Sequence, residues 1–569
     1  MNSKLRLRAR FVFIAVVGAA CLIVITLYRV QILKGESYAN RAEAQYARPS
    51  VSIFDRGSIL FQTKDGVDVA AASIARGYFL YLNPKLITNA DQTVEALSQY
   101  VTLDKNILSK GLNSTGSYAE LMHKLDSKTA DSIRSLKLAG VGISSEAWRS
   151  YPGGSLAAQT LGIIGENASS TAKGRYGIER SYDDVLTRPS QGSAVNVFAD
   201  LFSGLDTVFG TSNAYGDVVT TIEPTVETYV EKVLSDTSAE WHPDSIGGIV
   251  MDPQTGDIVA LASLPSFDPN DLSHITNVSV LANPLVEHVY EMGSIMKPLT
   301  MAVGIDTGAV TRNSTYDDVG CMVLDKKKIC NYDGRARGVI PMQEILNQSL
   351  NIGAATVALK VGKDRMADYF SSFGLGTTTG IDLPNEATGI IGNLTKKGQD
   401  IDVATASYGQ GIATSPVETA RALAVLANGG YLVTPHVVKE IQYIDGTKKV
   451  LNWPKEGPVL KPETVSTVAD MLVTVVDTKL ANGKIKMDHY SIGAKTGTAQ
   501  IADHVNGGYY PDRYLHSFFG FFPAHDPKFI IFLYQIYPKG ALYASETLTK
   551  PFDDLAKFLI NYYSITPDR

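Results

Sequence analysis

An unbroken run of apolar and weakly polar residues, from Phe11 to Tyr28, is the feature that most constrains how this chain folds. At about 1.5 Å of rise per helical residue the run is roughly 27 Å long, close to the thickness of a bilayer core. Four basic residues precede it: Lys4, Arg6, Arg8 and Arg10. The positive-inside rule therefore predicts a cytoplasmic tail over 1–10, one transmembrane helix over 11–28, and an extracytoplasmic remainder.

Two other interpretations of this run stay open. A cleaved secretory signal would have a shorter apolar region and a small-residue cleavage site, which the stretch 29–34 does not offer. A lipoprotein signal ending at Cys21 would need a large apolar residue where Gly18, Ala19 and Ala20 stand, and the apolar run continues to Leu27. The sequence favours a retained, single-pass anchor in the cytoplasmic membrane.

The length of the chain and a change in its residue pattern indicate more than one domain after the predicted anchor. The chain has 569 residues, too many for one ordinary core. Residues 29–216 mix short strands, helices and Gly/Ser-rich loops without a cluster of His, Cys, Asp or Glu at ligand or catalytic spacing, and we interpret them as a non-catalytic pedestal. Near Asp217 a strand-like run leads into Pro224 and an amphipathic helix, so we expect a second domain over 217–569 and an α+β fold. A net charge of −6 without a basic block gives no indication of nucleic-acid binding.

Ser294 and Lys297 form the first candidate catalytic pair. Pro298 has no N–H to donate to the carbonyl of Ser294, which places Ser294 in the first turn of a helix, with Lys297 on the same face. A lysine there can take the serine's proton only if its pKa falls by about 3 units, which costs roughly 4 kcal/mol and requires burial. Ser170 and Lys173 have the same spacing, so spacing alone does not decide.

Ser349 and Asn351 form a second candidate pair, between two segments that look helical, 341–346 and 352–361. Residues two apart do not face each other on a helix, so both side chains reach one cleft only if a turn separates the helices. There the hydroxyl could relay protons, and the amide could donate and accept hydrogen bonds. Ordinary helix capping by Ser and Asn is the alternative.

Lys495, Thr496, Gly497 and Thr498 form the third candidate element, ahead of apolar runs over 518–522 and 529–536. On a strand Thr496 and Thr498 share a face, and Gly497 would leave room for a ligand's backbone. With the charge of Lys495 this edge suits an extended peptide that ends in a carboxylate. The alternative is a plain edge strand interrupted by glycine.

Cys321 and Cys330 are the only cysteines beyond the apolar run. The residues between them look like a hairpin with a lysine-rich tip, a geometry that can bring two cysteines together, and the extracytoplasmic side permits oxidation. A disulfide and two free thiols are both open.

The order Ser-x-x-Lys, Ser-x-Asn, Lys-Thr-Gly closely resembles the penicillin-binding proteins and serine β-lactamases. The resemblance extends over roughly residues 29 to 545 to the class B, monofunctional penicillin-binding proteins. Further stretches carry it: 149–154, 174–182, 248–263, 408–416 and 517–523. The chain departs from the family at Met292, where proline is common, and at 60–64, where an Asp-Arg pattern is usual. The second departure bears on the subclass of pedestal.

The resemblance implies a membrane-anchored peptidoglycan D,D-transpeptidase whose catalytic domain is an antiparallel sheet flanked by helices, with no cofactor and no metal. Ser294 would attack the carbonyl of the penultimate D-alanine, and Lys297 would take its proton. Ser349 would pass a proton to the leaving amine, and Asn351 would orient the donor peptide. The residues that bind the peptide carboxylate would be Lys495, Thr496 and Thr498, with Gly497 between them.

The implied partners are stem peptides ending in D-Ala-D-Ala, β-lactams, the membrane, and a multi-span glycosyltransferase. The last is expected because the pedestal offers no paired carboxylates with which to polymerise glycan. A D,D-carboxypeptidase or β-lactamase, in which water replaces the acceptor amine, is one alternative function. A catalytically idle cell-wall scaffold is another, although the complete set of polar groups argues against it.

Overall fold

The computed structural model describes residues 55–114, 116–166, 172–188, 215–394, 398–503 and 505–569. Their contacts form two compact units, one of Ala75–Trp148 and one that joins Asp55–Ile74 to Arg149–Arg569. No helix in these ranges is both long and apolar enough to cross a bilayer. The predicted transmembrane helix over 11–28 lies outside them, and the predicted domain boundary at 217 stays a prediction.

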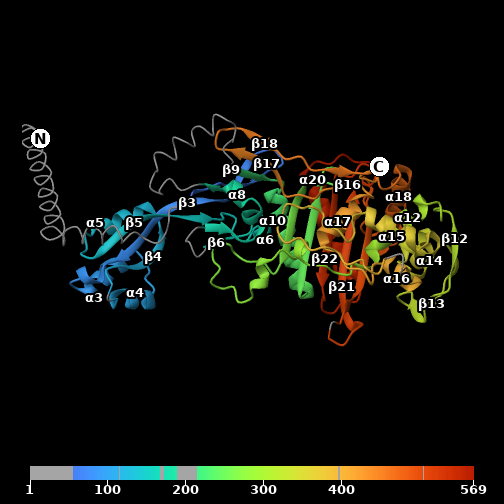
Figure 1. Ribbon diagram of the computed structural model, residues 1–569, viewed down its shortest axis with the longest axis horizontal. Coiled ribbons are helices and arrows are strands. Elements are labelled where there is room, and N and C mark those ends of the chain that lie inside the picture. Colours follow the sequence, from blue (N-terminus) through green and yellow to red (C-terminus); the bar gives the residue numbers. More distant parts are fainter. Residues whose placement is uncertain (1–54, 115, 167–171, 189–214, 395–397, 504) are drawn as a thin grey trace, which may run out of the picture. The chain divides into compact units, whose positions relative to one another are not determined.

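The smaller unit packs three short helices against strands (Figure 1). Its core consists of aliphatic side chains that are almost fully buried, among them Leu80, Leu97, Leu121 and Ile133. Each helix begins at an Asn or Asp whose side chain accepts a backbone N–H, which explains where it starts. The elements are β3 (Asp68–Leu82, which contributes to both units), η2 (Pro84–Leu86), α3 (Ala90–Ser98), α4 (Lys105–Leu112), β4 (Ala119–Leu125), α5 (Ser127–Ser135) and β5 (Val141–Ser150).

A five-stranded antiparallel sheet is the centre of the larger unit. Its strand order is β11-β10-β22-β21-β20, so β20 lies at an edge. The strands are β10 (Ser245–Met251), β11 (Ile258–Leu264), β20 (Gly493–Ala502), β21 (Tyr509–Phe522) and β22 (Phe529–Ile536). A hairpin joins β10 to β11, and the apolar runs over 518–522 and 529–536 lie on β21 and β22. β22 is buried along almost its whole length, which explains why it reads as a continuous apolar run.

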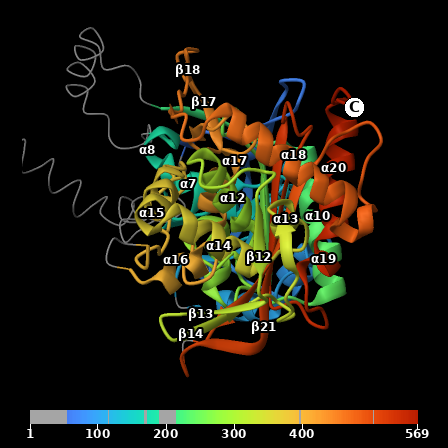
Figure 2. The ribbon, with the colours of Figure 1, turned by 90° about the vertical axis from the view of Figure 1, so that its right-hand side faces the viewer.

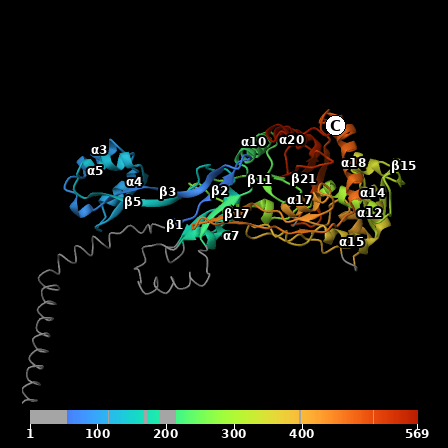
Figure 3. The ribbon, with the colours of Figure 1, turned by 90° about the horizontal axis from the view of Figure 1, so that it is seen from above.

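Helices cover both faces of this sheet (Figure 2). On one face α10 (Pro224–Trp241) contacts β11 and α20 (Thr549–Tyr562), with Val226, Val230 and Leu234 fully buried as predicted. On the other face lie α12 (Lys297–Asp306), α14 (Asn351–Val361) and α17 (Pro416–Ala424). Figure 3 shows α12, α14 and α15 (Lys363–Ser372) grouped beside α18 (Pro462–Thr478).

Helix α17 begins with a capping box formed by Ser415 and Glu418 and ends at Ala424. One predicted helix limit, that of the segment 341–346, was wrong. Pro341 closes strand β15 (Gly338–Pro341), and the following helix α13 begins only at Gln343 (Gln343–Asn347).

A second sheet ties the early part of the chain into the larger unit. Strand β2 (Ile59–Gln62) pairs in parallel with β9 (Gly216–Thr220), which pairs with β17 (Val438–Tyr443). The remaining elements are β1 (Asp55–Arg56), α6 (Ala158–Leu161), β6 (Ile164–Glu166), β7 (Ala172–Gly174), α7 (Gly177–Ser181), α8 (Asp183–Leu186), β8 (Thr187–Arg188), η3 (Val278–Leu281), α11 (Pro284–Glu287), β12 (Thr315–Asp318), α15 (Lys363–Ser372), α16 (Asp400–Ala406), β16 (Leu432–Val433), β18 (Lys448–Val450), β19 (Lys455–Glu456), α18 (Pro462–Thr478), η5 (Leu480–Gly483) and α19 (Ala544–Thr547).

Three separate stretches of the chain meet at one buried ion cluster. Arg56 lies on β1, Arg149 on β5 and Glu179 on α7. The two guanidinium Nε atoms lie 2.6 Å from the two oxygens of Glu179, and Arg56 also contacts Asp183 at 2.8 Å. Arg56 and Glu179 are 123 residues apart and Arg149 and Glu179 are 30 apart, so patterns among neighbouring residues do not indicate this cluster.

Candidate active site

Ser294 lies on a single 3-10 turn, η4 (Gly293–Met296), that leads directly into α12. The N–H of Lys297 donates to the carbonyl of Ser294, and Pro298 follows without an N–H, as the sequence predicts. Lys297 is almost fully buried, and its Nζ lies 2.9 Å from Ser294 Oγ. The serine and lysine therefore meet directly at the start of the helix.

Three glycines set how closely this turn packs against its neighbours. A Cβ at Gly293 would lie 2.9 Å from the carbonyl oxygen of Thr498, and one at Gly409 would lie 2.2 Å from that of Gly293. A Cβ at Gly497 would lie 2.7 Å from the Met292 carbonyl oxygen. The predicted reason for Gly497 was therefore wrong: its missing side chain admits the Ser294 turn, not a ligand.

Ser349 and Asn351 stand where the chain turns from α13 into α14. Ser349 has φ 56°, a left-handed conformation that L residues other than glycine rarely adopt, and Asn351 is the first residue of the next helix. The turn directs both side chains toward Lys297, whose Nζ lies 3.2 Å from Ser349 Oγ and 2.8 Å from Asn351 Oδ1. The predicted convergence of this pair on one cleft is what the geometry shows.

The hydrogen bonds of Lys297 determine what its amine can do. The backbone carbonyl of Ser349, at 2.5 Å, and Asn351 Oδ1 can only accept hydrogen bonds. A neutral amine has two hydrogens, and these two acceptors take both. Its lone pair is then left for a hydroxyl hydrogen, and Ser294 Oγ is the nearer of the two hydroxyls. The geometry fits a neutral lysine that accepts the proton of Ser294.

Burial and like charge favour that neutral form. Burial lowers the pKa of Lys297 well below its usual value, and the nearby Lys495 lowers it further. Burial alone lowers the pKa of Lys495 to about 7. Ser349 Oγ lies between the two amines, 3.1 Å from that of Lys495, and so offers a path for a proton.

The edge strand β20 forms one wall of a cleft of about 910 Å³ that contains Ser294. Thr496 and Thr498 both line it, as predicted from their shared strand face. Thr498 Oγ1 accepts the N–H of Ala544 at 3.1 Å, so its own hydrogen remains available for a ligand. The residues that line the cleft include Lys328, Lys479 and Lys495 but no Asp or Glu, so the cleft favours an anionic ligand.

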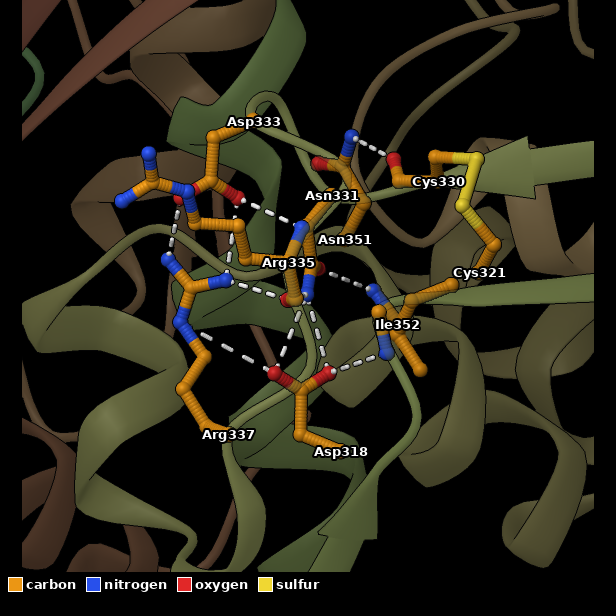
Figure 4. The surroundings of a disulfide bond; sticks show 10 residues. Asp318, Cys321, Cys330, Asn331, Asp333, Arg335, Arg337, Asn351 and Ile352 are labelled. Carbon is orange, nitrogen blue, oxygen red and sulfur yellow. Dashed lines mark hydrogen bonds and ion pairs between the residues drawn. A yellow bond between two sulfur atoms is a disulfide. The ribbon is translucent and has the colours of Figure 1, made fainter.

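A disulfide joins Cys321 and Cys330 beside this cleft (Figure 4). The cysteines pair across the hairpin of β13 (Cys321–Leu324) and β14 (Lys327–Cys330). The carbonyl of Cys330 accepts the side-chain N–H of Asn351 at 3.0 Å, which directs the amide oxygen of Asn351 toward Lys297. Sequence reasoning missed this contact because a backbone carbonyl leaves no signal in residue type.

The part of the chain that the structure describes contains no candidate metal site. No three His, Cys, Asp or Glu side chains lie close enough together there to hold an ion. The groups that contact Lys297 beside Ser294 are hydroxyls, a backbone carbonyl and an amide.

Comparison with known families assigns two regions of the chain. Residues 246–554 match the penicillin binding protein transpeptidase domain, which contains every site residue described above. The chain belongs to the penicillin-binding protein transpeptidase family. Residues 55–202 match the penicillin-binding protein dimerisation domain.

Relatives of this penicillin-binding protein match along nearly its full length. Stage V sporulation protein D of Bacillus subtilis is 28% identical over 565 residues, which cover 96% of this chain and 85% of that protein. The peptidoglycan D,D-transpeptidase FtsI of Buchnera aphidicola is 26% identical and covers 98% of this chain and 96% of its own length. Penicillin binding protein 3 of Mycobacterium tuberculosis, solved with ampicillin, has the same fold, with a TM-score of 0.69, 22% identity and coverage of 91% of this chain and 97% of that one.

Proposed function

We propose that this chain is a serine D,D-transpeptidase that cross-links the stem peptides of peptidoglycan through an acyl-enzyme at Ser294. The observation that carries the proposal is the arrangement at Lys297, whose two acceptor-only partners leave its lone pair for the hydroxyl of Ser294. Family membership and the D,D-transpeptidase relatives support the same reaction.

The acylation step follows from the contacts. The donor peptide lies along β20, with its terminal carboxylate against Lys495, Thr496 and Thr498. Lys297 takes the hydroxyl proton while Ser294 Oγ bonds to the carbonyl carbon of the penultimate D-alanine. The backbone N–H groups of Ser294 and Thr498 stabilise the oxyanion.

Collapse of this intermediate breaks the peptide bond. The departing amine of the terminal D-alanine takes the proton of Ser349 Oγ, which Lys297 then replaces. An ester between Ser294 and the shortened donor remains. An amine of a second stem peptide attacks that ester and gives a proton to Lys297. Lys297 returns a proton to Ser294 Oγ as its bond to the acyl carbon breaks, which forms the cross-link and restores Ser294 and the neutral lysine.

The setting of the reaction is also part of the proposal. The basic residues and apolar run over 1–28 support a single-pass anchor in the cytoplasmic membrane with the catalytic unit outside. A separate multi-span glycosyltransferase would supply the glycan strands, because residues 29–216 carry no sequence pattern for glycan polymerisation.

The test is mass spectrometry of the full-length protein with a synthetic peptide ending in D-Ala-D-Ala, with and without an acceptor amine. We expect an acyl adduct on Ser294 and, with the amine present, a cross-linked product. A penicillin should form the same ester, and Ser294→Ala should abolish both adducts. An adduct on another residue would contradict the proposal, and product formed only by water would favour a carboxypeptidase.

A further inference from the structure

The start of helix α14 lacks a cap of its own. Leu350 occupies the capping position and has no side-chain acceptor, so the N–H groups of the first turn need partners from elsewhere. Asn331 supplies one from across the fold: its Oδ1 accepts the N–H of Ile352 at 3.1 Å. Asn331 is buried and follows directly on Cys330, whose carbonyl holds the neighbouring Asn351 (Figure 4).

Asp318 fixes which way the amide of Asn331 faces. The Asp318 side chain is fully buried, and its two oxygens accept from Asn331 Nδ2 at 2.9 and 3.1 Å. Because an ionised carboxylate only accepts hydrogen bonds, the NH₂ of Asn331 must face Asp318 and its oxygen must face Ile352. Arg337, with Nε 3.8 Å from Asp318 Oδ2, balances the buried charge.

The same logic operates twice in succession. The carboxylate of Asp318 orients the amide of Asn331, and the carbonyl of Cys330 orients the amide of Asn351. Adjacent residues, Cys330 and Asn331, thus hold adjacent residues, Asn351 and Ile352. The Asn351 oxygen, directed in this way, takes one hydrogen of the Lys297 amine.

We propose that Asn331, oriented by Asp318, is a positioning residue for acylation: it caps α14 from outside and so holds Asn351 in the register that leaves the lone pair of Lys297 for Ser294. Neither Asn331 nor Asp318 contacts the reacting atoms, and they act through Asn351. The inference rests on the proposed acyl transfer at Ser294. Without the external cap the first turn of α14 loses its register, and a small misplacement of a catalytic group costs about ten- to a hundredfold in rate.

The test is the acylation of the full-length protein by benzylpenicillin, resolved into a non-covalent dissociation constant and an acylation rate constant. Asn331→Ala should lower the rate constant at least tenfold. Asn331 itself lines the cleft, but the β20 wall is untouched, so the dissociation constant should change less than threefold. The exchange Asn331→Asp with Asp318→Asn restores a donor facing a carboxylate and an acceptor for Ile352. It should recover most of the rate that Asn331→Asp alone loses, since the single substitution places a second carboxylate against that of Asp318.

A pH profile separates positioning from loss of folding. The groups that face Lys297 are Lys495, the Tyr408 ring 6.0 Å away, Ser294, Ser349 and Asn351. Loss of the Asn351 acceptor removes a bond that favours the ammonium, so the apparent pKa of acylation should fall in Asn331→Ala. Poorer folding alone would lower the fraction of protein that is acylated and leave the apparent pKa of the profile unchanged.

Asn428 provides a matched control. It is a buried asparagine that bridges the carbonyls of Pro253 and Tyr431, and it does not line the cleft. Asn428→Ala should lower thermal stability and leave the acylation rate constant of the folded protein unchanged. Folded Asn331→Ala with a wild-type rate constant, or a folded exchange variant no faster than Asn331→Asp, would overturn the proposal. A wild-type protein that forms no Ser294 adduct would instead overturn the proposed function on which it rests.

Discussion

Two regions of this protein bury positive charge, and they treat it in opposite ways. In the ion cluster Arg56 and Arg149 share the carboxylate of Glu179, and Arg56 also contacts Asp183. In the cleft two lysines approach the same hydroxyl of Ser349, and no carboxylate lines the space around them.

This difference in the pairing of buried cations shows how one chain obtains stability from one buried site and reactivity from another. A guanidinium cannot release its proton near neutral pH, so arginine suits a site where charge must persist and be paired. A buried lysine without an acid can lose its proton instead, and the pKa values of Lys297 and Lys495 fall accordingly. The unpaired site is the one that holds the nucleophile.

The substitution with the largest expected effect is Lys297→Arg, which introduces a permanent charge into the cleft. Acylation of Ser294 should fall about a thousandfold, the scale of a lost general base, because no group remains to take the proton. The measurement is the rate of penicillin adduct formation by intact-protein mass spectrometry. A correctly folded Lys297→Arg that acylates within tenfold of wild type would refute the role of the lysine.

The converse substitution is Glu179→Gln in the ion cluster. It removes the carboxylate charge that two buried guanidinium groups share. The free energy of unfolding should fall by about 3 kcal/mol, as when one partner of a buried ion pair is removed. Chemical denaturation measures it, with Glu440→Gln as the control because Glu440 pairs with the exposed Lys448 and should cost less than about 1 kcal/mol. Acylation by the folded protein should not change, and a large loss there would show that the two regions are coupled.

The pH dependence of donor-peptide binding tests the unpaired lysine Lys495 of the cleft. The pKa of Lys495 is about 7, so its amine gains a proton as the pH falls from 8 to 6. Binding of a peptide carboxylate should therefore tighten severalfold over this interval, and Lys495→Arg, which stays charged, should abolish the trend. Titration calorimetry with the Ser294→Ala protein measures the affinity without turnover. Affinity that weakens as the pH falls would contradict the assignment of Lys495.

The smallest expected effect concerns the exposed lysines of the cleft wall. Lys328→Ala or Lys479→Ala should weaken binding of an acidic stem peptide two- to fourfold, because exposed charges are screened, and should leave the acylation rate constant unchanged. Lys327→Ala is the control, since that residue shares the hairpin but does not line the cleft. If Lys327→Ala and Lys328→Ala had equal effects on peptide affinity, the lysine of the cleft wall would have no specific part in substrate binding.

The local parts of the fold could be predicted from the sequence. The apolar runs over 518–522 and 529–536 lie on β21 and β22, and the amphipathic helix predicted at Pro224 is α10. The turn containing Ser349 followed from the need for two residues, two apart, to reach one cleft. These predictions succeeded because each rests on neighbours in the chain.

The parts that could not be predicted depend on contacts between distant residues. The pairing of Arg56 with Glu179 spans 123 positions. The external cap by Asn331 joins a hairpin to a helix whose own sequence shows only a missing cap. Gly497 was recognised as significant, but whether its open side faces a ligand or the Ser294 turn is decided by the tertiary fold alone.

The three close-packed glycines around Ser294 also restrict how this protein can change under selection by β-lactams. Every residue that a point mutation can place at Gly293, Gly409 or Gly497 brings a Cβ to within 2.9 Å of a neighbouring backbone oxygen. Such a change would displace the nucleophile from substrate and drug alike. Escape from the drug with activity retained is therefore not expected at these three positions.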